Sequence, residues 1–245
     1  MVRAAFFDLD RTLLRRSSAL ALAKSFRDRG LISRRDLARA ALWQLLFSAR
    51  GASHEEVRRL AERGLGVLEG MTPAELTELV EAALEPVLRP LLAPEVVDAA
   101  HGFRERGYRT YIVSTALQEI VDALVADLGL DGGLGTVCEL VDGRYTGRAL
   151  RALHGEAKAE AVRELARREA VDLTASTAYS DSYSDLPFLE AVGHPVAVNP
   201  DRRLHRIAEQ RGWPVLQGRR PRFHPAVYGL PVVVGFALGA RKRAA

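Results

Sequence analysis

FFDLDRTLL, residues 6–14, decides the fold, because it ends a short apolar run with two aspartates, Asp8 and Asp10. Side chains alternate along a β-strand, so residues two positions apart project from the same face. In an open α/β sheet, ligands bind at the carboxyl ends of the strands. The stretch therefore predicts a core strand that presents two carboxylates at a binding edge. The alternative interpretation is a strand end whose aspartates are solvated or begin a turn.

The composition is that of an ordinary globular protein. The 245 residues are 48% hydrophobic, and 35 basic residues against 31 acidic ones leave a net charge of +4. There is no dense basic arm with interleaved aromatic residues, so nucleic acid is not an expected partner. A single cysteine, Cys138, excludes an internal disulfide and suits a reducing compartment. The apolar run after Arg3 is too short for a signal peptide, and we expect a cytoplasmic protein.

Residues 17–89 are predicted to be helical throughout. Three hydroxyl residues are each followed three positions later by an acid, which is the pattern of a helix N-cap. These pairs are Ser33 with Asp36, Ser53 with Glu56, and Thr72 with Glu75. Apolar residues then follow the helical period from Leu76 to Leu88. The segment is expected to form a small helical bundle.

From Leu91 onwards, predicted helices and strands alternate, which indicates an α/β protein with a Rossmann-like, mostly parallel sheet. The expected elements are a helix to Phe103, a strand at 108–115, a helix at 118–128, a hairpin or flap at 136–150, a helix at 157–168, and strands at 176–180 and 194–199. The predicted core therefore comprises residues 1–14 and 90–225, with residues 15–89 as a helical insertion.

The end of the chain differs in character. Residues 226–240, AVYGLPVVVGFALGA, carry no charge and are followed by Arg241, Lys242 and Arg243. Fifteen residues fall short of the ~20 that span a bilayer as a helix. Residues 226–245 are thus a separate apolar tail with a basic end. It either packs on the core or a neighbour, or makes a weak contact with the inner membrane surface through residues 226–243.

Three further groups of polar residues follow predicted strands or begin helices. Ser114 and Thr115 end the strand YIVST just before a helix, where hydroxyls and free amides form an anion site or a simple N-cap. Lys158 lies in the first turn of a helix. It is one of only three lysines among 35 basic residues, whereas the others are arginines, so a lysine at this position is unusual for this sequence. Its alternative interpretation is a solvated surface charge. Asp181 and Asp185 follow a short strand and are also candidates for the site. The alternative interpretation is that each acid only stabilises a turn or caps a helix.

Together these residues predict phosphoryl chemistry. Asp8, Asp10 and Asp181 would supply the hard oxygen ligands that suit Mg²⁺. Ser114, Lys158 and the metal would neutralise a phosphoryl group during transfer. One aspartate can attack phosphorus while its neighbour protonates the leaving oxygen and later activates water.

The ordered set resembles the haloacid dehalogenase superfamily. The D-x-D-x-T motif stands as DLDRT, which includes Thr12, and the second motif stands as YIVST. The helix-start lysine is Lys158, and the acidic loop is SDSYSD, residues 180–185. The helical insertion resembles the C1-type cap of the phosphoserine phosphatase-like branch, and GRYTGR, residues 143–148, resembles its substrate-flanking flap.

This resemblance implies a role for each matched residue. Asp8 would be the nucleophile and Asp10 the acid/base. The metal ligands would be Asp8, the Asp10 carbonyl and Asp181. Asp185 would support Lys158 or the metal shell, and Asp10 at the second motif position favours phosphatase or phosphotransferase chemistry over dehalogenation.

Two positions depart from true phosphoserine phosphatases. Arg11 occupies a position where these phosphatases share a serine. Ser17 occupies a position where they share a glutamate that binds the substrate amine. Arg11, with Arg15 and Arg16, could suit an anionic or sugar-like phosphate ester, or could belong to a solvated face of the cap.

The sequence therefore predicts a Mg²⁺-dependent phosphomonoester hydrolase that acts on a small phosphorylated metabolite through an aspartyl-phosphate. One alternative is a phosphotransferase that uses the same intermediate. Another is a non-catalytic, membrane-peripheral module that binds phosphate esters. The sequence leaves the oligomeric state open.

Overall fold

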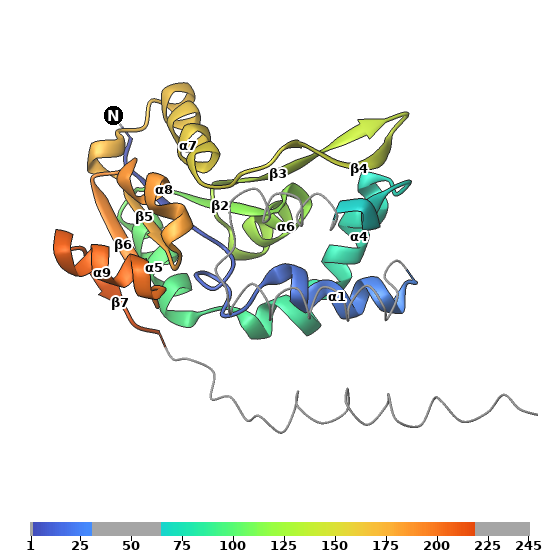
Figure 1. Ribbon diagram of the computed structural model, residues 1–245, viewed down its shortest axis with the longest axis horizontal. Helices are drawn as coiled ribbons and strands as arrows, with labels where there is room; N and C mark the ends of the chain where they lie inside the picture. Colours follow the sequence, from blue (N-terminus) through green and yellow to red (C-terminus); the bar gives the residue numbers. More distant parts are fainter. Residues whose placement is uncertain (1, 31–64, 219–245) are drawn as a thin grey trace, which may run out of the picture.

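The computed structural model describes residues 2–30 and 65–218 of the 245-residue chain (Figure 1). Within these residues, seven strands form one sheet in the order β4-β3-β2-β1-β5-β6-β7. Every neighbouring pair is parallel except β3 with β4. The strands are β1 (Ala4–Phe7), β2 (Arg109–Leu117), β3 (Gly132–Val141), β4 (Arg144–Arg151), β5 (Thr177–Ser180), β6 (His194–Val198) and β7 (Val215–Leu216). The predicted α/β class with a mostly parallel sheet is confirmed.

Helices cover both faces of this sheet. The α-helices of the described residues are α1 (Ser18–Asp28), α4 (Pro73–Ala83), α5 (Pro94–Glu105), α6 (Gln118–Leu128), α7 (Glu156–Glu169), α8 (Leu186–Glu190) and α9 (Arg202–Arg211). Shorter helical segments are η1 (Gly66–Leu68), η2 (Leu84–Leu88), η3 (Arg89–Leu91), η4 (Leu173–Ala175) and η5 (Tyr183–Asp185). One apolar cluster joins α1, α4, α5 and α6 to the sheet, and a second joins α7, α8 and α9 to it. The result is a three-layer α/β/α arrangement.

The first strand lies at the centre of the sheet, between β2 and β5. All four of its residues are fully buried. Ala5 and Phe7 belong to the cluster with α5 and α6, whereas Ala4 and Phe6 belong to the cluster with α7. A parallel strand covered on both faces needs apolar residues at every position, which is why the run AAFF forms it.

Helix α4 begins at a capping box, as predicted. The Glu75 amide donates to the Thr72 hydroxyl at 3.3 Å, and the Thr72 amide donates to the Glu75 carboxylate at 2.8 Å. The regular helix ends at Ala83, earlier than predicted, and continues to Leu88 as one wide turn. Pro86 lies in that turn and has no amide hydrogen to continue the α-helical ladder.

The predicted flap is the hairpin of β3 and β4. Asp142 and Gly143 make its two-residue turn, and both have positive φ, as a primed hairpin turn requires. The amide of Tyr145 donates to the Met71 carbonyl at 2.8 Å, and the Gly70 amide donates to the Tyr145 carbonyl at 2.9 Å. The hairpin is thereby joined to the segment that leads into α4. Figure 1 shows both together on the right of the view, away from β5, β6, α8 and α9.

Some predictions fall on residues that the structure does not describe. The N-cap pairs at Ser33 with Asp36 and at Ser53 with Glu56 lie outside the described ranges, as does the tail 226–245. In residues 2–30 and 65–218, no helix is long and apolar enough to cross a membrane. The limits of the insertion at 15–89 remain a prediction.

Candidate active site

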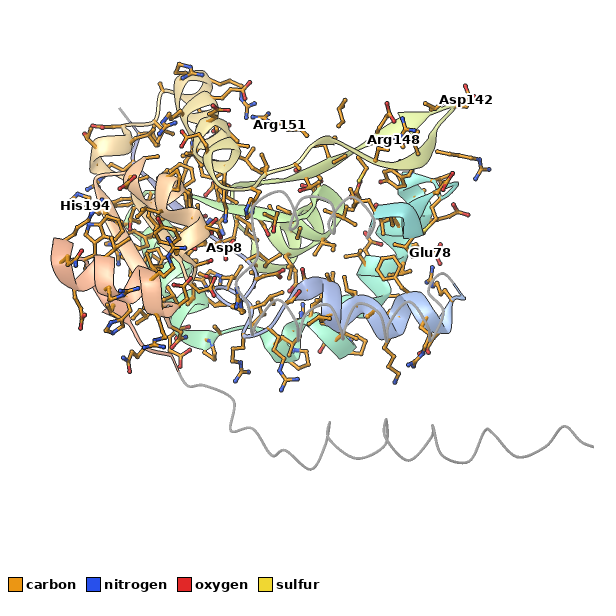
Figure 2. The ribbon with its side chains drawn as sticks, viewed as in Figure 1. Asp8, Glu78, Asp142, Arg148, Arg151 and His194 are labelled. Carbon is orange, nitrogen blue, oxygen red and sulfur yellow. The ribbon has the colours of Figure 1, made fainter. Side chains whose placement is uncertain are left out.

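Asp8 follows β1 directly and is held in the sheet by its backbone. Its amide donates to the Tyr179 carbonyl of β5 at 2.9 Å. Its side chain is only 9% exposed, and Lys158 Nζ donates to its Oδ1 atom at 2.6 Å. Figure 2 shows Asp8 near the middle of the molecule, between the left part of the sheet and helix α1. A carboxylate is thus fixed at the carboxyl end of the central strand, where ligands bind in such sheets.

Lys158 lies in the first turn of α7 and is 1% exposed, so its interpretation as a solvated surface charge is wrong. Its Nζ atom contacts Asp185 Oδ2 at 2.7 Å as well as Asp8, and lies 4.9 Å from the Phe188 ring centroid. Burial lowers the pKa of the ammonium, but the two carboxylates raise it by more. The side chain is therefore a buried, permanently charged cation between two acids.

The acidic loop closes this group of residues. Ser180, the last residue of β5, donates its hydroxyl to Asp185 Oδ2 at 2.7 Å. Asp181 follows immediately and is 5% exposed, and its Oδ2 atom lies 3.2 Å from Arg11 Nε. Arg11 has a positive φ of 65° and a side chain that is 65% exposed. Its guanidinium therefore reaches back over the site from solvent.

Two acids of this cluster, Asp8 and Asp181, have raised pKa values. Burial raises the pKa of Asp8 to about 7. Lys158 opposes that pKa shift, whereas Asp185 and Asp181 add to it. Burial also raises the pKa of Asp181 to about 6, against the opposing charge of Arg11. The site concentrates more negative charge than its two cations compensate, which favours an additional cation.

Asp10 makes different contacts from Asp8. One of its oxygens accepts the Ser18 amide at 2.7 Å, and the other accepts the Ser17 hydroxyl at 3.4 Å. Because β1 ends at Phe7, both aspartates lie after the strand, and strand alternation does not set their directions. That part of the prediction is wrong. Asp10 instead joins the turn after β1 to the start of α1.

Among the described residues, the side chains of Ser114, Thr115 and Thr12 do not join the hydrogen-bond network of the acids. Ser114 is fully buried, and its hydroxyl accepts the Ala116 amide at 3.0 Å. Thr115 has an exposed side chain, and its carbonyl accepts the Thr136 hydroxyl at 2.8 Å. The Thr12 hydroxyl is buried without a hydrogen-bond partner among residues 2–30 and 65–218. β2 extends to Leu117, so Ser114 and Thr115 lie within the strand and not at its end.

Comparison with known proteins identifies this arrangement. Residues 5–190 match the family described as haloacid dehalogenase-like hydrolases. The chain belongs to this family. It is 39% identical over 218 residues to a Mycobacterium tuberculosis protein named "Probable phosphatase", covering 89% of this chain and 76% of that protein. It is 36% identical over 242 residues to "Phosphoserine phosphatase SerB1" of the same species, covering 98% and 78%.

A solved structure has a similar fold. A protein of unknown function from Bordetella pertussis has a TM-score of 0.76 and 32% identity, and the match covers 88% of this chain and 98% of that one. The chain is therefore a phosphatase of the haloacid dehalogenase-like family, in its phosphoserine phosphatase-like branch.

Phosphatases of the haloacid dehalogenase-like family generally use Mg²⁺, and the donor atoms here fit that ion. Asp8 and Asp181 offer buried carboxylates with raised pKa values. In the described ranges, no three His, Cys, Asp or Glu side chains form a ready metal site. Mg²⁺ does not need one, since it is bound by one or two carboxylates and completes its shell with water or phosphate oxygens.

Sequence reasoning missed two contacts in this hydrolase. Ser180 has no predicted role, although a hydroxyl at the carboxyl end of a strand, beside Asp181, is a usable signal in the sequence. Ser18 was also missed. Its contact with Asp10 runs through a backbone amide, which leaves no trace in residue identity.

Proposed function

We propose that this phosphatase hydrolyses a small phosphate monoester in a Mg²⁺-dependent reaction that passes through an aspartyl-phosphate on Asp8. The observation that supports this most is the ion-pair chain of Asp8, Lys158 and Asp185, with separations of 2.6 and 2.7 Å. A buried nucleophile beside a fixed cation is the arrangement that phosphoryl transfer needs, because its catalysis depends on positioning and charge stabilisation.

In the first step, Asp8 attacks phosphorus and the bond between phosphorus and the ester oxygen breaks. Lys158 holds Oδ1, which leaves the second carboxylate oxygen to form the new bond. Asp10 donates a proton to the departing alkoxide, so that an alcohol leaves. In the second step Asp10 removes a proton from water, and the water oxygen attacks phosphorus. The bond between phosphorus and the Asp8 oxygen breaks, which releases inorganic phosphate and regenerates the Asp8 carboxylate.

Four other groups would assist. Ser114 is proposed to donate its hydroxyl to a phosphoryl oxygen, and Thr115 to assist in binding the same phosphoryl group. Asp181, Asp8 and the carbonyl of Asp10 would hold Mg²⁺, which neutralises charge on the phosphoryl oxygens when bound. Asp185 keeps Lys158 in place through its 2.7 Å contact.

The substrate class is narrowed by two positions. Ser17, whose hydroxyl lies 3.4 Å from Asp10, cannot supply the carboxylate expected to bind a substrate amine. Arg11 adds a positive charge beside Asp181. Both features favour an anionic or sugar-like phosphate ester over phosphoserine, the substrate that the name of one relative indicates. We propose that residues 15–89 form the cap that selects it.

The proposal is tested by measuring phosphate release from a panel of phosphate esters, phosphoserine included, with and without Mg²⁺. Asp8→Asn keeps the size of the side chain but removes the nucleophile, and should abolish turnover. Asp98→Asn, an exposed aspartate on α5, is the matched control and should retain full activity. Metal-dependent turnover that survives in Asp8→Asn would exclude the mechanism. Release of alcohol in excess of phosphate, when a second alcohol is present, would identify a phosphotransferase.

A further inference from the structure

Asp201 lies outside the site and contacts the acidic loop that carries Asp181 and Asp185. This aspartate precedes α9 and is its N-cap. Its backbone amide donates to the Asp181 carbonyl at 2.8 Å. Its Oδ2 atom accepts the Tyr183 amide at 2.7 Å and lies 3.5 Å from the Ser182 hydroxyl. Asp201 therefore contacts the peptide groups on both sides of Ser182.

The second carboxylate oxygen of Asp201 has a separate role. Oδ1 accepts the amides of Arg203 at 2.8 Å and Leu204 at 2.9 Å, which satisfies free donors at the start of α9. The Arg203 guanidinium carbon also lies 3.8 Å from the centroid of the Tyr183 ring, so α9 contacts the loop a second time. One oxygen thus caps a helix while the other holds the loop.

Within the described residues, the carboxylate of an ordinary capping aspartate, Asp172, makes hydrogen bonds only to its own turn. Asp172 is the N-cap of η4, and its Oδ1 atom accepts the Thr174 amide at 2.9 Å and the Thr174 hydroxyl at 2.6 Å. These contacts stay within its own turn. The contacts of Asp201 with Ser182 and Tyr183 span 19 and 18 positions of the chain and end at the acidic loop.

We propose that Asp201 is a positioning residue, which holds residues 181–185 in the conformation that binds Mg²⁺ and that keeps Asp185 against Lys158. Asp201 contacts the backbone of the loop and the Ser182 hydroxyl, and it touches no reacting group. The part of this proposal that concerns Mg²⁺ rests on the proposed function. Without the Asp201 carboxylate, the Tyr183 amide loses its acceptor and the peptide group between Ser182 and Tyr183 can rotate. The carboxylate of Asp181 would then be less well fixed before the metal arrives.

Two substitutions separate the two roles of Asp201. Serine and asparagine cap helices about as well as aspartate, so Asp201→Ser and Asp201→Asn should keep α9 intact. Neither residue has two acceptor oxygens, and the serine hydroxyl is also too short to reach both the helix and Tyr183. Asp172→Ser and Asp172→Asn are the matched controls, because they alter a cap with no contact to the loop.

The measurement is the melting temperature of the full chain against Mg²⁺ concentration, with no substrate present. Without Mg²⁺, the Asp201 variants should unfold close to the wild-type temperature. They should need about tenfold more Mg²⁺ for half of the maximal stabilisation, which is the loss expected for a residue that supports metal ligands. The Asp172 variants should need the wild-type concentration.

The outcomes distinguish the two proposals. If the wild-type protein is stabilised by Mg²⁺ and both Asp201 variants respond at the same concentration, Asp201 acts only as a helix cap and the inference is wrong. An equal loss in the Asp172 variants would also contradict it, since the effect would then be general. If the wild-type melting temperature does not respond to Mg²⁺ at all, the proposed metal dependence fails, and the role of Asp201 fails with it.

Discussion

Lys158 Nζ lies 2.6 Å from Asp8 Oδ1, although 150 positions of sequence separate the two residues. The contact brings the first turn of α7 against the end of the central strand, inside the protein. Breaking a buried ion pair by removing one partner is strongly unfavourable, because the remaining charge is left without compensation. The pair is therefore the most sensitive point of the site.

Substitution of Lys158 should separate its charge from its packing. Lys158→Met fills a similar volume beside Phe188 but leaves Asp8 and Asp185 without a cation. We expect turnover to fall by on the order of 10²- to 10³-fold, as for other groups that stabilise developing charge. Lys158→Arg should not restore it, because a planar guanidinium does not fit an ammonium site.

Steady-state phosphate release under saturating Mg²⁺ measures this loss. Lys24→Met is the control, since Lys24 lies exposed on α1. A Lys158→Met variant that keeps half of the wild-type rate would show that the ammonium has no part in catalysis.

Mg²⁺ should stabilise the protein more at about pH 8 than at about pH 5. The pKa of Asp8 is about 7 in the folded protein and that of Asp181 about 6, against an ordinary value of 3.8. Between those values the folded state binds more protons than the unfolded state, so these groups remove stability as the pH rises through that window. At the higher pH both carboxylates are negatively charged, so bound Mg²⁺ compensates more charge and stabilises the folded protein more.

Melting temperatures with and without Mg²⁺ at the two pH values test this linkage. In Asp8→Asn the side chain at position 8 no longer titrates, so the difference between the two pH values should shrink. An equal Mg²⁺ effect at both pH values in the wild-type protein would contradict the prediction.

Tyr145→Phe should destabilise the contact between the flap and the core. The Tyr145 hydroxyl donates to Glu119 Oε1, and Glu119 Oε2 is buried without a partner among the residues described. Removing the hydroxyl leaves the whole carboxylate unsatisfied, so we expect the free energy of unfolding to fall by about 1–3 kcal/mol. Urea denaturation measures it. Tyr108→Phe, at a partly exposed tyrosine, should change little, and an equal effect in both variants would count against the prediction.

Cys138 should be unreactive in the folded protein. Burial, followed by the charge of Glu119, raises the pKa of its thiol to about 11. At neutral pH, roughly one thiol in 10⁴ would then be the reactive thiolate. A disulfide reagent should label the native protein far more slowly than the urea-unfolded chain. Equal labelling rates would mean that the thiol is accessible and ionised.

The parts of the site that could be predicted are those with a local signal. The run AAFF before Asp8 predicts a buried parallel strand, and the structure confirms it. The rarity of lysine made Lys158 a candidate even though its surroundings resemble an exposed helix, and the side chain is in fact buried. The capping box at Thr72 and Glu75 likewise depends only on neighbouring residues.

The parts that could not be predicted depend on where a local element stops or on contacts across the fold. Strand alternation was extended to Asp8 and Asp10, but β1 ends at Phe7 and the chain turns. The contact of Arg11 with Asp181 was hidden because arginine is abundant throughout the sequence. Asp201 resembles any helix cap in sequence, and only the fold brings it to the acidic loop.

The central place of β1 has a consequence for synthesis of the protein on the ribosome. The amide of Ala4 donates to the Ser176 hydroxyl, 172 positions further on, and one edge of β1 pairs only with β5. At about 5–20 residues per second, that edge waits on the order of ten to thirty seconds for its partner to emerge. Through that interval the nascent chain carries an apolar strand with an unpaired edge, which leaves that edge open to pairing with other chains until β5 emerges.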